Sequence, residues 1–155
     1  MPRVLVLLAI LGCALPAAAQ TTPPRPRGGA EATADRYEGQ RRNGRPHGRG
    51  VLTMANGDRY EGEFQNGQMQ GRGTYLWANG DRYTGHFVAG KQQGHGVQVF
   101  ANGSRYEGAW HQDRAQGYGE YYSIQAGWYR GSWRDGCYRE PPRVAAVGRP
   151  LFDCE

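Results

Sequence analysis

Arginine side chains recur in this sequence at a constant spacing of 23 residues, always just before a tyrosine. They are Arg36, Arg59, Arg82 and Arg105. A column of guanidinium groups on one surface could bind anionic lipid headgroups or an acidic polymer through paired hydrogen bonds. The candidate anion-binding residues are therefore Arg59, Arg82 and Arg105. Glutamates follow two residues later at three of the four positions, so cross-strand ion pairs are the competing interpretation.

Aromatic side chains form two more columns at the same spacing. The first consists of Tyr37, Tyr60, Tyr83, Tyr106 and Tyr129, and the second of Phe64, Phe87, Trp110 and Trp133, which Arg41 interrupts in the first unit. Tyr and Trp combine an apolar ring with a polar group, so they suit stacking on sugars or insertion at a membrane interface. The candidate binding residues on this face are Tyr60, Tyr83, Tyr106 and Trp110. The competing interpretation is that these rings are the packed face of the fold.

Residues suited to catalysis or metal binding do not form a recognisable set. The histidines occupy four different places in the repeat: His47, His86, His95 and His111. His86 and His95 share a predicted hairpin, but no cysteine or further histidine completes a zinc ligand set. The sequence shows no nucleophile motif, no paired catalytic carboxylates and no phosphate-binding loop apart from the glycines of the repeat. We expect no enzyme activity, no cofactor and no metal.

A 23-residue repeat places all these side chains along the chain. Near-complete units begin at Tyr37, Tyr60 and Tyr83, a fourth begins at Tyr106 and changes near its end, and a partial one begins at Tyr129. Repeat proteins bury the apolar surface of each unit against its neighbours, so a chain with 38% hydrophobic residues and 25 glycines can still form a core. The array is predicted to span residues 35–140.

Each unit contains the pattern of two strands. In Arg59–Phe64, aromatic residues and a glycine alternate with charged residues, which is typical of a strand with one buried face. A second strand is predicted at Thr74–Trp77, after a turn region that includes Asn66–Gly67 and the Gly71-x-Gly73 motif. Asn79–Gly80 then predicts a type I′ hairpin turn, in which both central residues have positive φ, and the same turn is predicted at Asn56–Gly57 and Asn102–Gly103.

These elements predict an all-β fold, an elongated ribbon of antiparallel β-hairpins that forms a meander of 23-residue units with a C-terminal cap. Four and a half units of two strands each give about nine strands. The glycine in the third place of each unit falls on the aromatic face and is predicted to leave room for neighbouring rings. These glycines are Gly39, Gly62, Gly85, Gly108 and Gly131.

The first residues have the pattern of a secretory signal peptide. Residues 1–19 contain Arg3, an apolar run too short to span a bilayer, and three alanines that end at Ala19. Cys13 ends a sequence similar to a bacterial lipoprotein cleavage box, so a lipoprotein is the alternative to cleavage after Ala19. Residues 20–34 are rich in proline, arginine and glycine and are predicted to be a flexible linker. The expected location is secreted or periplasmic.

The charge of the chain argues against a nucleic-acid partner. The formal net charge is +5, and it falls to +4 when Arg3 is removed with the signal peptide. That excess is mild for nucleic-acid binding, and export separates the protein from nucleic acids.

Two cysteines remain besides Cys13. Because an even pair in an exported protein typically forms a disulfide, Cys137 and Cys154 are predicted to be bonded. Residues 141–155 are expected to form a cap or tail that folds back over the last hairpin and covers its open edge.

The sequence motif resembles a known repeat family. The pattern Y-E-G-x-F/W, followed by N-G, G-x-G and A-N-G-D-R at 23-residue spacing, is similar to the MORN (membrane occupation and recognition nexus) repeat over residues 35 to about 140. The resemblance implies an elongated single β-ribbon of hairpins. It implies function only loosely, because the family supplies scaffolds, dimerisation surfaces and phospholipid-associated modules. Export departs from its mostly intracellular members.

We therefore predict a non-catalytic, exported interaction or scaffold protein that acts at a membrane or cell-envelope surface. Its partner would be a protein or an anionic membrane. Two alternatives stay open: a glycan- or cell-wall-binding module that uses the aromatic face, and a structural protein that self-associates.

Overall fold

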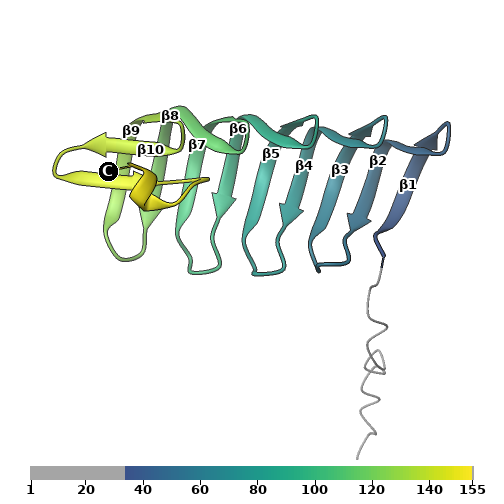
Figure 1. The fold of residues 1–155 in the computed structure, drawn as a ribbon, viewed down its shortest axis with the longest axis horizontal. Coiled ribbons are helices and arrows are strands. Elements are labelled where there is room, and N and C mark those ends of the chain that lie inside the picture. Colours follow the sequence, from purple (N-terminus) through teal and green to yellow (C-terminus); the bar gives the residue numbers. More distant parts are fainter. Residues whose placement is uncertain (1–33, 155) are drawn as a thin grey trace, which may run out of the picture.

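The repeated units fold into one open sheet in which neighbouring strands are antiparallel and follow one another in chain order (Figure 1). The computed structural model describes residues 34–154, within which the sheet has 11 strands. They are β1 (Arg36–Arg42), β2 (Arg45–Thr53), β3 (Arg59–Gln65), β4 (Gln68–Leu76), β5 (Arg82–Val88), β6 (Lys91–Val99), β7 (Arg105–His111), β8 (Arg114–Ser123), β9 (Gly127–Arg134), β10 (Cys137–Glu140) and β11 (Arg143–Ala146), followed by the 3₁₀ helix η1 (Leu151–Cys154). This confirms the predicted all-β ribbon of hairpins. The signal peptide, Cys13 lipidation and all but the last residue of the predicted linker lie outside the described residues.

The ribbon has more strands than the nine or so predicted, because the chain after Gly136 adds the hairpin β10–β11. The second strand of each unit is also longer than predicted. β4 begins at Gln68, so Gly71 and Gly73 lie within a strand and not in a turn. Gly71 has a φ of 69° beside a register shift on β3, which is the signature of a β-bulge.

Two kinds of turn alternate along the two sides of the ribbon. On one side, two-residue turns place both residues in the left-handed region, as at Asn66 (φ 51°) and Gly67 (φ 91°). The Asn56–Gly57 turn on the other side is a three-residue loop, closed by bonds from Gly57 N to Met54 O and from Met54 N to Asp58 O, and only its glycine has positive φ. The type I′ prediction was therefore wrong for Asn56–Gly57, Asn79–Gly80 and Asn102–Gly103.

The core is a continuous chain of aromatic rings on one face of the sheet. Tyr60 contacts Phe64 in its own unit and Phe87 in the next, with ring centroids 5.1 and 5.0 Å apart and planes nearly perpendicular. Similar edge-to-face contacts link Tyr83 to Phe87 and to Trp110. Such a pair is worth about 0.5–1.5 kcal/mol beyond the burial of its area. Each unit therefore completes the core of its neighbour.

A row of glycines crosses the sheet under the tyrosine rings. Each of the strands β1 to β9 contributes one glycine, which lies opposite the glycine of the next strand. These glycines are Gly39, Gly50, Gly62, Gly73, Gly85, Gly96, Gly108, Gly119 and Gly131. Tyr60 lies over this row and donates its hydroxyl to Glu63 O at 3.0 Å. A Cβ atom at Gly73 would overlap the Tyr60 ring, and one at Gly62 would lie 2.6 Å from the Cα atom of Gly73. The predicted role of the glycines is confirmed.

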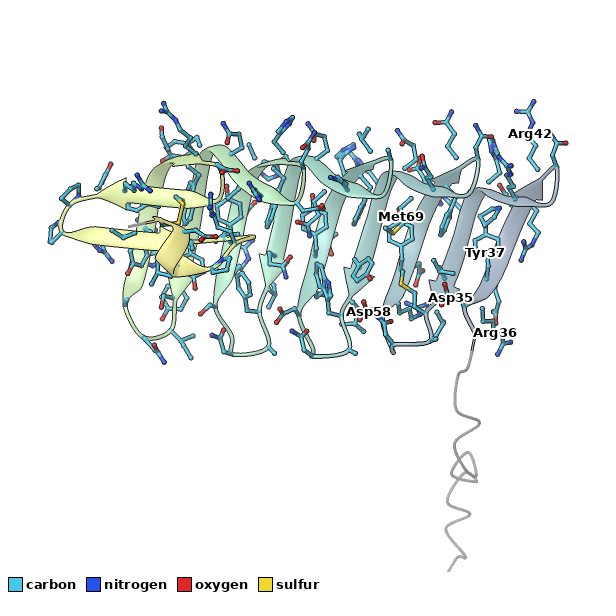
Figure 2. All side chains as sticks on the ribbon, in the orientation of Figure 1. Asp35, Arg36, Tyr37, Arg42, Asp58 and Met69 are labelled. Carbon is cyan, nitrogen blue, oxygen red and sulfur yellow. A yellow bond between two sulfur atoms is a disulfide. The ribbon has the colours of Figure 1, made fainter. Side chains whose placement is uncertain are left out.

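Polar side chains along both sides of the ribbon tie each unit to the next. On the side of the three-residue loops, Asp58 Oδ1 accepts a hydrogen bond from Ala78 N at 2.8 Å, and the same bond recurs one unit later. On the other side, Gln70 Oε1 accepts from Ala89 N at 3.1 Å. Figure 2 shows Asp58 on the first side and Arg42 on the second. These bonds satisfy turn backbone groups that the strands leave unpaired.

The C-terminal segment folds back across the ribbon. β10 and β11 run across the direction of β1–β9 (Figure 1). The chain then returns to β8, where Ala115 N donates to Val147 O at 3.4 Å. No helix within residues 34–154 is long and apolar enough to cross a membrane.

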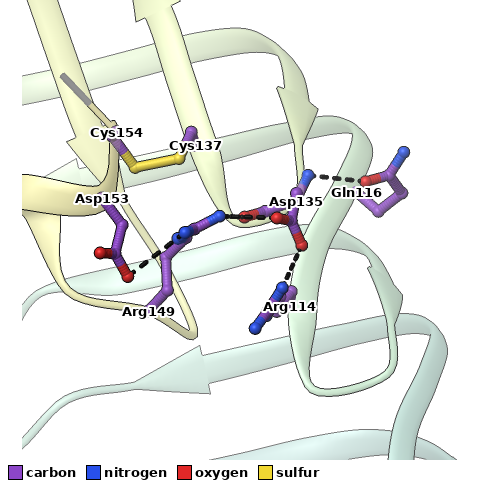
Figure 3. The surroundings of a disulfide bond; sticks show 7 residues. All are labelled: Arg114, Gln116, Asp135, Cys137, Arg149, Asp153 and Cys154. Atoms are coloured by element: carbon purple, nitrogen blue, oxygen red, sulfur yellow. Dashed lines mark hydrogen bonds and ion pairs between the residues drawn. A yellow bond between two sulfur atoms is a disulfide. The ribbon is translucent and has the colours of Figure 1, made fainter.

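A disulfide and an ion-pair cluster hold this segment. Cys137 and Cys154 form the predicted bond, with 5.5 Å between their Cα atoms. Beside it, Arg149 lies 2.6 Å from Asp135 and 3.2 Å from Asp153 (Figure 3). The hydrogen bond from Arg114, together with Arg149, lowers the pKa of Asp135 although partial burial opposes the shift.

Candidate binding site on the aromatic face

The predicted anion-binding arginines lie on the face opposite the aromatic core, and two of the three are held in ion pairs. Arg59 Nη2 lies 2.7 Å from Glu61 Oε2, and Arg105 makes the equivalent pair. The partner stands two residues along the same strand, where both side chains share one face, so the prediction of cross-strand pairs was wrong here. Arg82 is followed two residues later by a threonine and makes no ion pair with any residue in 34–154. The arginine column is largely neutralised.

The predicted aromatic binding residues belong to the core. Tyr60, Tyr83 and Tyr106 are 0% exposed, and burial raises the pKa of each hydroxyl. Each hydroxyl donates to the carbonyl oxygen three residues later. Trp110 is 3% exposed, and its Nε1 donates to Gly96 O at 3.2 Å. These rings are the packed face of the ribbon, and among them only Trp110 also borders an open pocket.

A pocket of about 430 Å³ opens on the aromatic face across the second, third and fourth units. We call it the aromatic pocket. Its lining includes the side chains of Tyr75, Trp77, Gln92, Gln98, Phe100 and Trp110. Its volume falls within the range of about 300–1,000 Å³ that is usual for small-molecule sites. The rings of Tyr75, Trp77 and Phe100 are only half-buried, so they are accessible to a ligand.

Two glutamines in the third unit stand where other units carry mostly apolar or aromatic residues. Gln92 occupies the place of Met69 in the second unit, and Gln98 occupies the place of Tyr75. Both glutamines are 5% exposed. The 3.5 Å between Gln92 Nε2 and Gln98 Oε1 is a weak hydrogen bond. Neither glutamine has a side-chain atom among the fully buried polar atoms that lack a partner within residues 34–154, so their unbonded amide atoms are open to the pocket.

A buried carboxylate holds the Tyr75 ring in place. The Tyr75 hydroxyl donates to Asp58 Oδ2 at 2.7 Å, while Ala78 N and Asn56 Nδ2 donate to the same carboxylate. Burial alone would raise the pKa of Asp58, but the hydrogen bonds from Tyr75, Ala78 and Asn56 keep it below its usual value. Asp58 therefore stays ionised and fixes the ring at the pocket.

Two further carboxylates stand at the rim of the pocket. Asp113 Oδ1 accepts a hydrogen bond from Gln92 N at 2.8 Å, and Asp81 Oδ1 accepts one from Ala101 N at 2.8 Å. Gly148 of the C-terminal segment also lines the pocket. Among the lining residues, which all belong to the described part of the chain, none is Lys, Arg or His. The pocket therefore favours neutral or cationic ligands over anions.

The histidines lie away from this pocket. His86 and His95 border a shallow hollow on the opposite face, where Arg72 Nε donates to His86 Nε2 at 3.3 Å. His111 Nδ1 is 3.0 Å from Gln93 Nε2. Within residues 34–154, no group of three or more His, Cys, Asp or Glu side chains is arranged to hold a metal ion.

The side chains that give the pocket its character were not predicted as site residues from the sequence. Gln92 and Gln98 were not singled out, although a comparison of equivalent positions shows that the third unit alone carries an amide at both. Tyr75 and Trp77 were assigned to a strand and not to a site. The sequence feature that could have indicated the pocket is the pair of positions at which the third unit differs from the other units.

Comparison with known proteins agrees with the geometry of the ribbon. The MORN repeat matches four consecutive segments, residues 37–59, 60–82, 83–105 and 106–124, which together make up more than half of the chain. No curated protein matches the sequence closely enough to be counted as a relative. On the strength of its four consecutive repeats, the chain belongs to the MORN repeat family.

Proposed function

We propose that this protein is an exported, non-catalytic interaction ribbon that holds a partner in its aromatic pocket at the cell envelope. MORN repeats suggest an interaction or scaffold role in general, through proteins or membrane lipids. The observation that carries the present proposal is the aromatic pocket, where accessible rings lie beside two buried amides with unused hydrogen-bonding capacity. Such a mixture of apolar surface and a few fixed polar groups is typical of a binding site.

Two features support export. Residues 1–19 have the composition of a signal peptide, with Arg3 before an apolar run and alanines at the end. The Cys137–Cys154 disulfide is the kind of bond that persists in an oxidising compartment outside the cytosol. A location at the envelope would give the pocket access to extracellular or periplasmic partners.

The chemistry of the pocket supports binding without catalysis. Its ionisable carboxylates, Asp81 and Asp113, each accept hydrogen bonds from backbone N–H groups that they hold in place. Apart from these two carboxylates, the lining residues, all of them described, include no Ser, Cys, His or Lys that could act as a nucleophile or proton-transfer group. The arrangement fits recognition, because one oxygen of each acid is already bonded to a backbone N–H group.

A second candidate is an anionic membrane surface bound by the opposite face. The observation in its favour is Arg82, which is exposed and has no acidic neighbour two residues later. Against it stand the ion pairs of Arg59 and Arg105. Self-association of the ribbon is a third expectation, which light scattering of the purified protein would detect.

Co-sedimentation of the purified protein with an insoluble envelope fraction and with neutral and anionic vesicles tests the proposal. We expect binding to the envelope fraction, and we expect Trp77→Ala to weaken it while Trp128→Ala does not. Trp128 is the matched control because it is exposed on β9, outside the pocket lining. Envelope binding that Trp77→Ala and Phe100→Ala both leave unchanged would refute the proposal. Binding to anionic vesicles that Arg82→Ala abolishes would favour the second candidate.

A further inference from the structure

Two amide groups on the inner surface of the aromatic pocket have hydrogen-bonding atoms to spare. Gln92 and Gln98 contact each other through one long bond, from Gln92 Nε2 to Gln98 Oε1. Gln92 Oε1 and Gln98 Nε2 take no part in this bond or in any other hydrogen bond within residues 34–154, and neither is among the fully buried atoms that lack a partner. Both atoms belong to side chains of residues that are 5% exposed and line the pocket. An acceptor and a donor therefore stand ready for a ligand that carries both kinds of group.

The neighbouring wall offers flat apolar surface. The ring centroids of Tyr75 and Trp77 are 4.6 Å apart with planes at 46°, and Phe100 continues this wall in the next unit. Because the Tyr75 hydroxyl is already bonded to Asp58, its ring contributes mainly an apolar face. A ligand that fits must combine an apolar face with a polar edge.

The charges around the pocket limit the ligand further. Asp113 is exposed at the rim, and its Oδ1 accepts from Gln92 N, which leaves Oδ2 able to accept a hydrogen bond from a ligand. Asp81 adds a second negative charge. Phosphorylated or acidic ligands would therefore be repelled, whereas the free acceptor atoms Gln92 Oε1 and Asp113 Oδ2 favour a ligand with many hydroxyl donors.

We propose that the aromatic pocket binds a neutral saccharide chain. A sugar ring presents one face of C–H groups, which packs against an aromatic ring, and a rim of hydroxyls that both donate and accept hydrogen bonds. Hydroxyls of one sugar unit would donate to Gln92 Oε1 and accept from Gln98 Nε2, while the ring stacks on Trp77 or Tyr75. This inference rests on the proposed function, because it names the ligand class of the same pocket.

Saturation-transfer NMR with defined probes tests this assignment. The probes are chitotetraose, cellotetraose and maltotetraose, each offered to the purified protein. We expect saturation transfer to at least one of them. The substitutions Gln92→Leu and Gln98→Leu should each weaken that binding roughly tenfold, as expected for one lost hydrogen bond with a ligand.

The variants are chosen so that loss of binding is not loss of fold. Leucine is an apolar side chain of similar size, and the double variant Gln92→Leu/Gln98→Leu replaces both partners of the hydrogen bond between the two amides, so it should be nearly neutral for stability when no ligand is bound. Gln65→Leu is the matched control, because Gln65 is an exposed glutamine at the end of β3 and does not line the pocket. The Gln65→Leu variant should bind the sugar as tightly as the unaltered protein does.

Three results would overturn the saccharide assignment. These are no transfer to any of the probes, transfer that the double variant Gln92→Leu/Gln98→Leu leaves unchanged, or displacement of a bound envelope partner by extended synthetic peptides but by none of the sugars. The proposed function fails separately. If the sugars do not bind but Trp77→Ala still abolishes envelope binding, the pocket has a different ligand; if Trp77→Ala and Phe100→Ala leave envelope binding intact, the pocket is not the site.

Discussion

Asp58 shows how one side chain can serve the fold and the candidate site together. It is 7% exposed, and its carboxylate accepts hydrogen bonds from Ala78 N at 2.8 Å and from the Tyr75 hydroxyl at 2.7 Å, both in the following unit. Asn56 Nδ2 donates to it at 3.0 Å from its own loop. A buried carboxylate with so many donors is stable only while it is ionised.

The substitution Asp58→Ala should therefore reduce the free energy of unfolding by about 2–3 kcal/mol near neutral pH, because it leaves buried donors unpaired. The pKa of Asp58 lies below its usual value in the folded protein, so its stabilising effect is present above about pH 4 and is lost as the pH falls through the folded pKa. Urea unfolding of the two proteins from pH 7 down to about pH 2 measures this, and the difference between them should shrink in acid.

Asp81→Ala is the matched control for this experiment. Asp81 repeats the bond to the next unit, but it has no tyrosine hydroxyl among its hydrogen-bond partners in the described chain. Asp81→Ala should therefore lower the free energy of unfolding by less than Asp58→Ala does. Equal losses for the two variants, or a difference independent of pH, would contradict the role given to Asp58.

At the scale of the hairpin, the alternation of side chains was enough to predict the strands, but the turns needed information from neighbouring units. Asn66–Gly67 and Asn56–Gly57 are the same dipeptide, yet the first is a two-residue turn and the second part of a three-residue loop. In the second case Asn56 Oδ1 accepts from Asp58 N, while Asp58 bonds to the next unit. The loop is thus stabilised by contacts distant in sequence, which a local pattern does not contain.

The aromatic pocket was not predicted from the sequence for a related reason. The regular columns of arginine and tyrosine were predicted to bind, but a residue that recurs in every unit serves what every unit needs, which is packing and pairing. Tyr60 and Tyr83 are buried for that reason. The aromatic pocket instead depends on Gln92 and Gln98, where the third unit departs from the others. Trp110 alone among the predicted residues lines it.

The contribution of the disulfide in the C-terminal segment to the stability of the fold can be measured separately. The Cys137–Cys154 bond closes a loop with a sequence separation of 17. Removal of the bond in Cys137→Ser/Cys154→Ser should lower the free energy of unfolding by about 3 kcal/mol, the value for a loop of that size. Amide hydrogen exchange should accelerate most in β10 and β11 and at Ala115, whose N–H donates to Val147. Both effects are measurable on the purified protein.

A reducing agent supplies the control for the disulfide prediction. It should destabilise the unaltered protein by the same amount and leave the serine double variant unaffected. Unchanged stability of both proteins would mean that Arg149, with its ion pairs to Asp135 and Asp153, is sufficient to hold the segment in place.

The whole molecule is an array in which each strand pairs only with its neighbours in sequence. Its two ends differ. The C-terminal end is covered by the folded-back segment, whereas β1 has no strand on its outer side in the described chain. β1 is exposed except for half-buried Tyr37, and it carries Arg36, Arg41 and Arg42. Charges on an open edge oppose pairing with another sheet, so the edge is protected against aggregation but is weakly stabilised.

The stability of such an array should therefore depend on position. Tyr83→Ala removes a fully buried ring that contacts Phe87 and Trp110, and we expect it to cost about 3–5 kcal/mol. Tyr37→Ala removes the equivalent ring at the open end, where it is half-buried beside Phe64, and should cost clearly less. Because the substitution is the same at two equivalent positions, the difference in cost measures how stability depends on the position of a unit in the array.

Hydrogen exchange followed strand by strand distinguishes local from global effects. In the unaltered protein β1 should exchange faster than the inner strands, because it is paired on one side only, and β2 should follow it because its outer partner is this open edge. Tyr37→Ala should accelerate exchange in those strands alone, and Tyr83→Ala should do so in strands on both sides of β5. If Tyr37→Ala accelerated exchange in β8 and β9 to the same extent as in β1, the ribbon would unfold as one cooperative unit. The aromatic pocket would then be only as stable as the open edge.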